Sequence, residues 1–395
     1  MKLCFFHAGA DLYGADNILF LIVEGLSAVG ANITVYLPYE GPLATKLRNL
    51  SGVEVTIFPF AVLRRSAIRG FRGFNFAWSL CKSVWWCLRE IKRIQPDVVH
   101  TNTLVVWPAA IASRLLGVPH IWHVHEIVRQ PRILGWVLAH LALIFSNRVI
   151  AVSDAVKRQL VEYSPTLEDK IRIIHNGINA TYFHPMNDSK SFRTEIGIPE
   201  GNILVGMIGR VNRIKGQSFF LDAIKQIQDQ SNLNFAIVGG VFPGEEALFE
   251  SLKEKILNLN IKNTHLIGFT PDVQTIHAAF DIFVLPSVKP DSFPTVVLEA
   301  MATGRPVIAT RCGGVEEMLV DGETGVLVNW TDPSELASAI MKLATDSGLR
   351  LRMGERGRQR LLDRFSIDRF KADIIECFNE HLLSPEPTKS KISIQ

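Results

Sequence analysis

Residues Leu285–Thr310, LPSVKPDSFPTVVLEAMATGRPVIAT, read as a strand, a polar loop, a helix and a second strand. The first apolar run ends near Pro286, and Pro294 suits the first turn of a helix, where its missing N–H would have no intrahelical partner. The apolar run RPVIAT, residues 305–310, follows the helix. A strand, a helix and another strand in this order form the repeating unit of a parallel sheet.

The same alternation of apolar runs and segments of helical period extends through the rest of the chain. In the first half, the runs that we expect to be strands are Lys2–His7, Ile33–Leu37, Val53–Phe58, Val98–His100, Ile121–Val124 and Val149–Val152. In the second half they are ILVGMIG, NFAIVGG, THLIGF, DIFVLPS, RPVIAT and TGVLV. The sequence therefore predicts an α/β protein with two Rossmann-like β/α/β domains that face each other across a cleft.

A polar stretch that contains prolines and glycines separates the two halves. We expect a first domain at residues 1–185, a linker at 186–202, a second domain at 203–365, a C-terminal helix at 366–383 that packs back toward the first domain, and a tail at 384–395. In open parallel sheets, ligands bind at the carboxyl ends of the strands. The functional residues are therefore expected in loops that follow strands.

Composition argues against several classes of protein. The 42 Lys and Arg residues against 39 Asp and Glu residues leave a net charge of +3, which does not indicate a nucleic-acid-binding protein. Five scattered cysteines do not form the pattern of a disulfide framework or a cysteine-cluster zinc site. The longest apolar stretch, Ile133–Phe145, is shorter than the ~20 residues of a membrane-spanning helix. We interpret the N-terminus as a strand rather than a signal peptide and expect a cytoplasmic protein.

The loop and helix within Leu285–Thr310 contain residues suited to a nucleotide. Helix N-termini bind phosphate through free N–H groups and the helix dipole, which nominates Thr295 and Val296 as donors. Glu299 follows Thr295 on the same helix face, where a carboxylate can accept both hydroxyls of a ribose. The alternative is that Asp291 and Ser292 only cap the helix and that Glu299 is a solvated surface charge.

Two cations follow a predicted strand in the segment MIGRVNRIKGQSFFLDAI (Met207–Ile224). Arg210 and Lys215 lie between this strand and the next helix, where they can neutralise a diphosphate leaving group as a metal ion would. Basic residues in loops are more often simply solvated, so this loop alone does not identify a site.

Taken together, these segments resemble the retaining glycosyltransferases of family four (glycosyl transferases group 1), of the bacterial surface-polysaccharide type. Asp291 and Glu299 match the paired acids of that family, and Arg210 and Lys215 match its Arg and Lys. The segments GGVEEMLVDGETGVLV, VSDAVKRQL and IHNGIN match its closing loop and the hinge side of its first domain. Asp291 stands where Glu is more frequent, and Pro294 stands where Gly is common and removes one N–H. The resemblance implies the GT-B fold, with an acceptor-side first domain and a second domain that binds the nucleotide sugar.

The resemblance also implies an activity, the transfer of a sugar from a nucleotide-diphosphate sugar to the hydroxyl of a lipid-linked or growing surface glycan. The implied catalytic residues are Arg210, Lys215, Asp291 and His125. The implied donor-binding residues are Gly14, Arg210, Lys215, Phe293, Pro294, Thr295, Val296 and Glu299. The family's front-face attack lets the leaving phosphate oxygen take the proton of the acceptor hydroxyl. The sequence contains no Asp-x-Asp, so we expect no metal and no cofactor.

A glycine-containing turn, GADLYGADN (Gly9–Asn17), follows the first predicted strand, and it is not a GxGxxG fingerprint. In the family this loop lies near the donor diphosphate and the acceptor, which nominates Gly14 and, on the acceptor side, Asp16. The alternative is a simple strand-to-helix turn with Asp16 near the helix cap.

His123 and His125 lie on one face of the strand predicted in IWHVHEI (Ile121–Ile127). Three interpretations compete: a metal pair, which lacks an obvious third ligand; a packed core histidine; and, by resemblance, a histidine that approaches the transferred sugar from the strand end. We prefer His125, which is nearer the strand end, and we keep His123 and Glu126 as acceptor-side candidates.

Basic and aromatic residues are interleaved in Arg64–Arg93, where Glu90 is the one acid. On helices this mixture suits docking on an anionic membrane surface, so we expect a peripheral position on the inner face of the membrane. The alternatives are nucleic-acid binding, which nothing else in the chain supports, and helices that pack their aromatic residues inward and keep solvated arginines outside.

Two other functions compete with the transferase. A nucleotide-sugar epimerase of the same fold would convert the donor without any acceptor. A non-catalytic nucleotide-sugar-binding subunit would tolerate the loss of the charge-stabilising pair, whereas Arg210 and Lys215 are intact.

Overall fold

The computed structural model describes residues 1–63, 72–242 and 244–383. The chain divides into two compact units. The N-terminal unit comprises Met1–Ala151, Gln159–Ile174 and Phe370–Gln395, and the C-terminal unit comprises Val152–Arg158 and His175–Arg369. The chain therefore passes between the units more than once, and three of the passages lie within residues 151–175.

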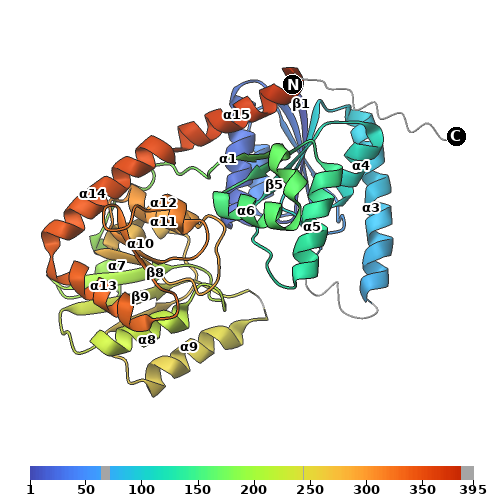
Figure 1. Ribbon diagram of the computed structural model, residues 1–395. Helices are drawn as coiled ribbons and strands as arrows, with labels where there is room; N and C mark the ends of the chain where they lie inside the picture. The colour runs from blue at the N-terminus through green and yellow to red at the C-terminus, as the bar shows by residue number, and fades with distance from the viewer. Residues whose placement is uncertain (64–71, 243, 384–395) are drawn as a thin grey trace. The chain divides into compact units, whose positions relative to one another are not determined.

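A seven-stranded sheet, in which every strand is parallel to its neighbours, forms the centre of the N-terminal unit (Figure 1). In spatial order its strands are β3 (Val53–Ile57), β2 (Asn32–Leu37), β1 (Lys2–His7), β4 (Val98–Asn102), β5 (His120–Val124), β6 (Arg148–Ala151) and β7 (Ile171–Ile173). The helices along this part of the chain are α1 (Gly14–Ala28), α2 (Pro42–Arg48), α3 (Arg72–Ile94), α4 (Pro108–Leu116), α5 (Arg132–Phe145), α6 (Asp154–Tyr163) and the 3₁₀ helix η2 (Pro165–Lys170).

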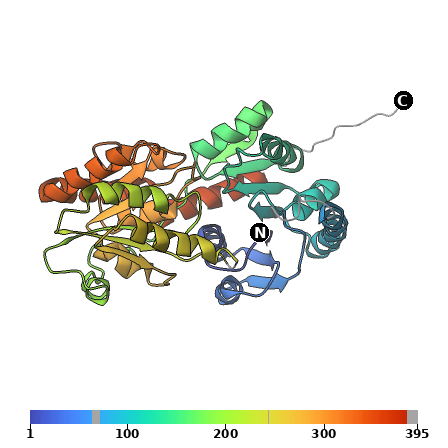
Figure 2. The same cartoon turned by 90° about the horizontal axis from the view of Figure 1, so that it is seen from below.

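A six-stranded parallel sheet forms the centre of the C-terminal unit. Its spatial order is β10 (Thr264–Ile267), β9 (Leu233–Val238), β8 (Ile203–Ile208), β11 (Ile282–Leu285), β12 (Val307–Thr310) and β13 (Gly325–Val328). The helices are α7 (Lys190–Glu195), α8 (Gln217–Ile227), α9 (Glu246–Asn258), α10 (Val273–Ala279), α11 (Thr295–Ala302), α12 (Val315–Met318), α13 (Pro333–Thr345) and α14 (Ser347–Arg364). In Figure 2, α8 and α9 lie next to each other in this unit.

Both sheets have central strands that are buried along their whole length. Every residue of β8, β9 and β11 is buried, and the same holds for β4 and β5. Such continuous apolar burial is typical of parallel strands that helices cover on both faces. Side chains at the strand ends, where the loops begin, are therefore the ones free to take up polar roles.

The last helix, α15 (Ile367–Leu383), belongs mainly to the core of the N-terminal unit. Phe370, Ile374 and Phe378 are buried with residues of β1 and α1, and the Phe378 ring lies 5.8 Å from that of Phe5. On the helix surface, ion pairs join α15 to β7 and α1: Arg172 with Glu376 and Glu380, and Lys371 with Glu24.

The predicted fold class is confirmed, because each half is a parallel α/β unit. The strand β7 is not predicted from the sequence, because it has three residues, lies at the edge of its sheet and is only half-buried. The predicted β4 also ends two residues early, since Thr101 and Asn102 are polar yet fully buried in the strand. Pro294 precedes α11 as its N-cap instead of lying in the first turn, because its ψ of 109° is extended.

Candidate active site

Two loops of the C-terminal unit meet at the carboxyl ends of β8 and β11. Gly216, just before α8, has a φ of 77°, and a Cβ there would lie 1.8 Å from the carbonyl oxygen of Pro286. Only glycine allows this approach, because it has no side chain and tolerates a positive φ. The close contact holds the loop after β8 against the end of β11, and so brings Lys215 toward Asp291.

Lys215 and Asp291 form an ion pair, with Nζ 2.5 Å from Oδ2. The two side chains retain 21% and 17% of their exposure, so the pair is partly shielded but can still be reached by a ligand. Asn212 accepts the backbone N–H of Lys215 through Oδ1 at 3.0 Å. On the other side, the N–H of Gly314 donates to the carbonyl of Asp291 at 2.8 Å. The sequence places these two candidates 76 residues apart, and the structure brings them together.

Arg210 follows β8 in the same loop and is half-buried. Its guanidinium carbon lies 3.5 Å from the centre of the Phe242 ring, a cation–π contact that orients the side chain. Gln217 donates to the Arg210 carbonyl at 3.0 Å. The guanidinium keeps its charge at any physiological pH and is suited to a diphosphate.

The start of α11 offers backbone donors rather than side chains. Thr295 and Val296 are its first two residues, so their N–H groups have no acceptor within the helix. Phe293 is only 3% exposed, and its ring lies 5.0 Å from that of His175 and 5.6 Å from that of Phe365. Its side chain therefore anchors the loop in the core, and its contribution to donor binding is limited to its backbone.

Glu299 accepts a hydrogen bond from a buried histidine that the sequence analysis did not nominate. His277 of α10 is fully buried, and its Nε2 lies 3.0 Å from Oε2 of Glu299. The other ring nitrogen, Nδ1, is buried without a partner. A carboxylate only accepts, so the proton is on Nε2. His277 thus fixes one oxygen of Glu299 and leaves the other oxygen for a ligand.

The nominated residues of the N-terminal unit lie at the ends of β1, β4 and β5. His125, which directly follows β5, is half-buried, and its Nε2 is 2.8 Å from Oδ1 of Asn102. Asp16 is 6% exposed and bonds His7 through Oδ1 at 2.6 Å and the N–H of Tyr13 through Oδ2 at 2.9 Å. Asp16 therefore both caps α1 and joins a polar network, and Gly14 is the exposed first residue of that helix.

His123 lies deeper than His125 and has no polar partner. It is fully buried, and both of its ring nitrogens lack hydrogen bonds. Burial, together with the neighbouring His100, holds its pKa well below the usual range, so the ring is neutral. The described residues contain no group of three or more side chains placed to hold a metal ion. His123 therefore fits the core interpretation.

Glu126 has a perturbed carboxyl group. Burial raises its pKa to about 7, although its Oε2 accepts the N–H groups of Leu104 at 3.2 Å and His125 at 3.1 Å, which act in the opposite direction. A carboxyl that titrates near neutral pH beside a candidate histidine is typical of functional sites.

A carboxylate between the closing loop and α6 is a further polar group that the sequence analysis missed. Glu317 accepts the N–H groups of Asp154 and Ala155, the first residues of α6, at 2.8 and 3.0 Å. It also accepts from Nε2 of His175 at 2.9 Å. Burial opposes its ionisation, but these hydrogen bonds outweigh burial and lower its pKa.

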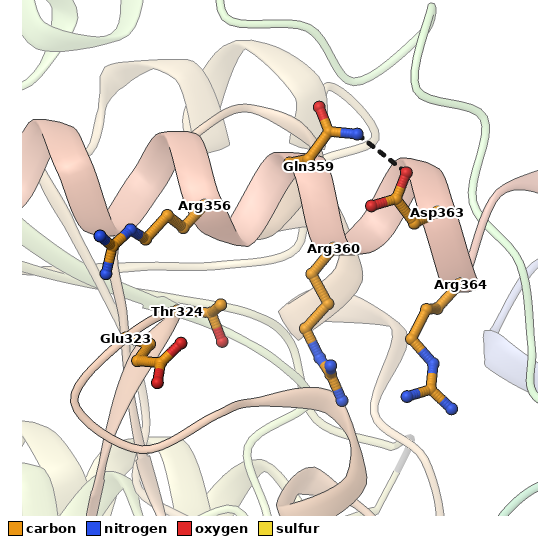
Figure 3. Close-up of a pocket in the computed structure, with 7 residues that line it drawn as sticks. All are labelled: Glu323, Thr324, Arg356, Gln359, Arg360, Asp363 and Arg364. Carbon is orange, nitrogen blue, oxygen red and sulfur yellow. Dashed lines mark hydrogen bonds between the residues drawn. The ribbon is translucent and has the colours of Figure 1, made fainter.

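A groove of about 390 Å³ lies elsewhere on the C-terminal unit, between α14 and the turn before β13 (Figure 3). Arg356, Arg360 and Arg364 point from α14 toward the side of Glu323 and Thr324. Arg360 bonds the carbonyls of Glu317 and Met318. None of the residues nominated from the sequence lines this groove.

The predicted basic segment is only partly described, because residues 64–71 lie outside the described residues. In α3, Trp78 and Trp85 are 72% and 59% exposed, and the Arg89 guanidinium lies 4.9 Å from the Trp85 ring centre. Trp78 and Trp85 therefore do not pack inward, whereas Trp86 stacks on Phe58 at 3.7 Å and Phe76 contacts Trp107, as the alternative interpretation expects. Among the described helices, none is long and apolar enough to cross a membrane.

Comparison with known proteins identifies the family and the fold of the chain. A family model described as Glycosyltransferase Family 4 matches residues 13–182, and one described as Glycosyl transferases group 1 matches residues 188–360. D-inositol 3-phosphate glycosyltransferase of Corynebacterium glutamicum (strain R) is 31% identical over 87% of this chain and 86% of its own. Alpha-maltose-1-phosphate synthase of Mycolicibacterium smegmatis is 27% identical over 72% and 79%. The crystal structure of Anabaena HepE in complex with UDP and glucose has a TM-score of 0.82, with 25% identity over 96% of this chain and 99% of that one.

The two parallel α/β units and their match to HepE show the GT-B fold, and the two family models show the class, a glycosyltransferase. The chain belongs to glycosyltransferase family 4, glycosyl transferases group 1. The resemblance drawn from the sequence motifs is thereby confirmed.

Proposed function

We propose that the protein is a retaining glycosyltransferase that moves a sugar from a nucleotide-diphosphate sugar to an acceptor hydroxyl without a metal ion. The observation that carries this proposal is the Lys215–Asp291 pair, which joins the loop that contains Arg210 to the loop that leads into α11. Two cations and a helix N-terminus on one strand edge suit a diphosphate. HepE, with 25% identity, was crystallised with UDP-glucose and with UDP and glucose, which makes UDP-glucose the first donor to test.

Each of these residues binds a different part of the donor. A bound diphosphate gives Lys215 a second anionic partner, which releases the Asp291 carboxylate to accept sugar hydroxyls. Glu299, with one oxygen held by His277, accepts a ribose hydroxyl through the other. Arg210 and the N–H groups of Thr295 and Val296 hold the remaining phosphate charge.

The transfer itself needs no covalent intermediate on the protein. The bond from the anomeric carbon to the phosphate oxygen breaks, and a bond to the acceptor oxygen forms on the same face. The acceptor's proton moves to the departing phosphate oxygen. Lys215 and Arg210 stabilise the charge that develops on the diphosphate as this bond breaks.

We propose a lipid-linked or growing surface glycan as the acceptor, reached by peripheral docking on the inner face of the membrane. Exposed apolar side chains support this: Trp78 and Trp85 on α3, and Ile133 and Trp136 on α5, which are 72% and 50% exposed. Tryptophan beside arginine is favoured at membrane interfaces. Cosedimentation with anionic vesicles should decrease strongly for Trp78→Ser/Trp85→Ser. Equal pelleting of the variant and the parent would contradict docking through α3.

The function is tested by a thermal-shift screen against UDP, GDP, ADP and their sugar conjugates, because a ligand that binds the folded state raises its stability. Transfer is then assayed with the stabilising donor and a panel of acceptors that includes lipid-linked glycans and inositol phosphate. A donor consumed without acceptor to give a sugar isomer would identify an epimerase. Binding without any turnover across the panel would indicate a binding subunit.

A further inference from the structure

A series of hydrogen bonds joins the ends of three strands in the N-terminal unit. His7 ends β1, Asn102 ends β4, and the two residues are paired in the sheet register. Asp16 Oδ1 lies 2.6 Å from His7 Nε2, and Asn102 Nδ2 lies 3.1 Å from His7 Nδ1. Asn102 Oδ1 then lies 2.8 Å from Nε2 of His125. Every link connects atoms of side chains that are buried or half-buried.

The contacts of the Asn102 amide determine which nitrogen of His125 carries a hydrogen. The Asp16 carboxylate only accepts, so His7 Nε2 carries a hydrogen. The amide nitrogen of Asn102 only donates, and its two hydrogens go to His7 Nδ1 and to the carbonyl oxygen of Ala15, which is 3.1 Å away. Oδ1 of Asn102 is therefore an acceptor, and Nε2 of His125 must carry the hydrogen between them.

We infer that Asn102 is a positioning residue that holds His125 as the Nε2–H imidazole, so that Nδ1 accepts a hydrogen bond from a substrate hydroxyl. This inference rests on the proposed function, since a sugar or acceptor hydroxyl is the group that would donate to Nδ1. The carbonyl oxygen of Ala15 prevents the amide of Asn102 from turning over, because it can only accept a hydrogen bond, and His7 and Asp16 pack on the same side of the amide. A reversed amide would present a donor to His125 and would select the opposite tautomer.

The surroundings keep His125 neutral. Burial lowers its pKa well below the usual range, and the neighbouring rings of His123 and His7 act in the same direction. The other ionisable groups of the cluster are Asp16, which is bonded to His7, His100 on β4, and Glu126, whose Oε2 binds the backbone N–H of His125. A neutral ring with one fixed hydrogen has one donor, used by Asn102, and one acceptor.

The tautomer is measured directly by nitrogen-15 NMR of the imidazole rings in the full chain, with the His125 signals assigned by their loss in His125→Gln. We expect the Nε2–H form at pH 7. An Nδ1–H tautomer or an imidazolium at this pH would overturn the inference. This measurement needs no substrate, so its result is independent of whether the protein transfers sugars.

Two substitutions on the same strand provide the matched test. Asn102→Asp replaces the amide by a carboxylate of the same shape, which should raise the titration midpoint of His125 by about one to three pH units. Thr101→Val removes the hydrogen bond from the neighbouring residue to Nε2 of His120, 2.8 Å long, and should leave the titration of His125 unchanged. An unchanged His125 midpoint in Asn102→Asp would contradict the role of Asn102. If that variant does not fold, Asn102→Ser is used with the same readout.

Activity measurements distinguish a positioning role of Asn102 from a role in stability alone. In Asn102→Asp, kcat should be about 10-fold below that of the parent one pH unit below the raised midpoint of His125, and it should recover as the pH rises, because the imidazolium that accumulates at low pH cannot accept a hydrogen bond. The KM for the donor should change less. Deoxy forms of the donor sugar and of the acceptor then identify the partner hydroxyl: the analogue that lacks it should lose its sensitivity to Asn102→Asp. A fall in kcat that is independent of pH would contradict the inference.

Discussion

The strand ends of the two units carry opposite kinds of polar group. In the C-terminal unit they are charged and paired across loops, as in Lys215 with Asp291. In the N-terminal unit they are an imidazole–amide network that is fixed by one carboxylate, Asp16, and that leaves His125 neutral. Both sheets use the same edge, but a diphosphate requires compensating charge, whereas a hydroxyl requires an oriented donor or acceptor. The proposed function uses this contrast: the charged C-terminal unit would bind the diphosphate, and the neutral His125 of the N-terminal unit would accept a hydroxyl.

The largest expected effect concerns the charged strand ends of the C-terminal unit. Lys215→Ala should lower kcat by roughly 10²–10³, the cost of losing one preorganised charge stabiliser. Arg213→Ala is the matched control, because Arg213 is an exposed cation of the same loop and should leave kcat nearly unchanged.

Chelation tests whether these cations act alone. EDTA should leave transfer by the unmodified protein unchanged, since Lys215 and Arg210 supply the charge on the proposed mechanism. Loss of activity in EDTA with recovery on addition of a divalent ion would show that the charged strand ends work together with a metal.

A second prediction distinguishes the roles of Glu299 and Asp291 in the C-terminal unit. Glu299→Gln should weaken binding of the free nucleoside diphosphate by roughly 10- to 100-fold, because hydrogen bonds to a charged group are lost. Asp291→Asn should spare the free nucleotide and weaken its sugar conjugate. Calorimetric titration with both ligands measures the split, and equal losses for the free nucleotide would refute it.

A buried histidine of the C-terminal unit provides a further test. His277→Phe keeps the ring but removes the N–H that fixes Glu299, so the nucleotide Kd should rise by about 2- to 10-fold. His277→Gln retains a donor and should recover part of the loss. If the Phe variant bound nucleotide like the parent, His277 would have only a packing role.

The smallest expected effect is on stability and concerns the N-terminal unit. The folded pKa of Glu126, raised by burial to about 7 from its ordinary value of 4.5, means that the folded chain holds this proton more tightly. The free energy of unfolding should therefore decline as the pH rises from 4.5 to about 7 and level off above it. Glu126→Gln should remove this part of the slope. Denaturant titrations of both proteins at pH 5, 6, 7 and 8 measure it, and parallel pH profiles would contradict it.

The sequence predicts the charged half of the candidate site far better than the neutral half. Asp291 and Glu299 lie in one segment, and Arg210 and Lys215 in another, so short motifs identify them. His7 and Asn102 are 95 residues apart and meet only through the pairing of β1 with β4. Asn102 also lies inside a buried strand, where an amide carries no signal of its own. Its position at the strand's carboxyl end is the clue that could have nominated it.

The first residue of a helix and the hydrogen-bond partners of polar side chains are also hard to predict from the sequence. Apart from β7, the strands are predicted to within two residues, because apolar runs mark them. By contrast, α11 begins after Pro294, since the loop conformation decides its first residue. His277 carries no motif, because its role depends on α10 packing beside α11. Motifs identify residues that touch ligands, and tertiary packing selects the residues that hold them.

The hydrogen bonds of Glu317 limit the conformational freedom of the connecting chain. Asp154, Ala155 and His175 lie close to three of the points where the chain passes between the units, and one carboxylate binds all three. Each backbone residue that is fixed loses about 1–2 kcal/mol of entropy, so a connection that is already ordered has less to lose when a ligand binds. Glu317 also follows Gly313 and Gly314, which contact the backbone of Asp291. The carboxylate that orders Asp154, Ala155 and His175 is therefore only three positions from Gly314, whose N–H supports the backbone of the proposed sugar site.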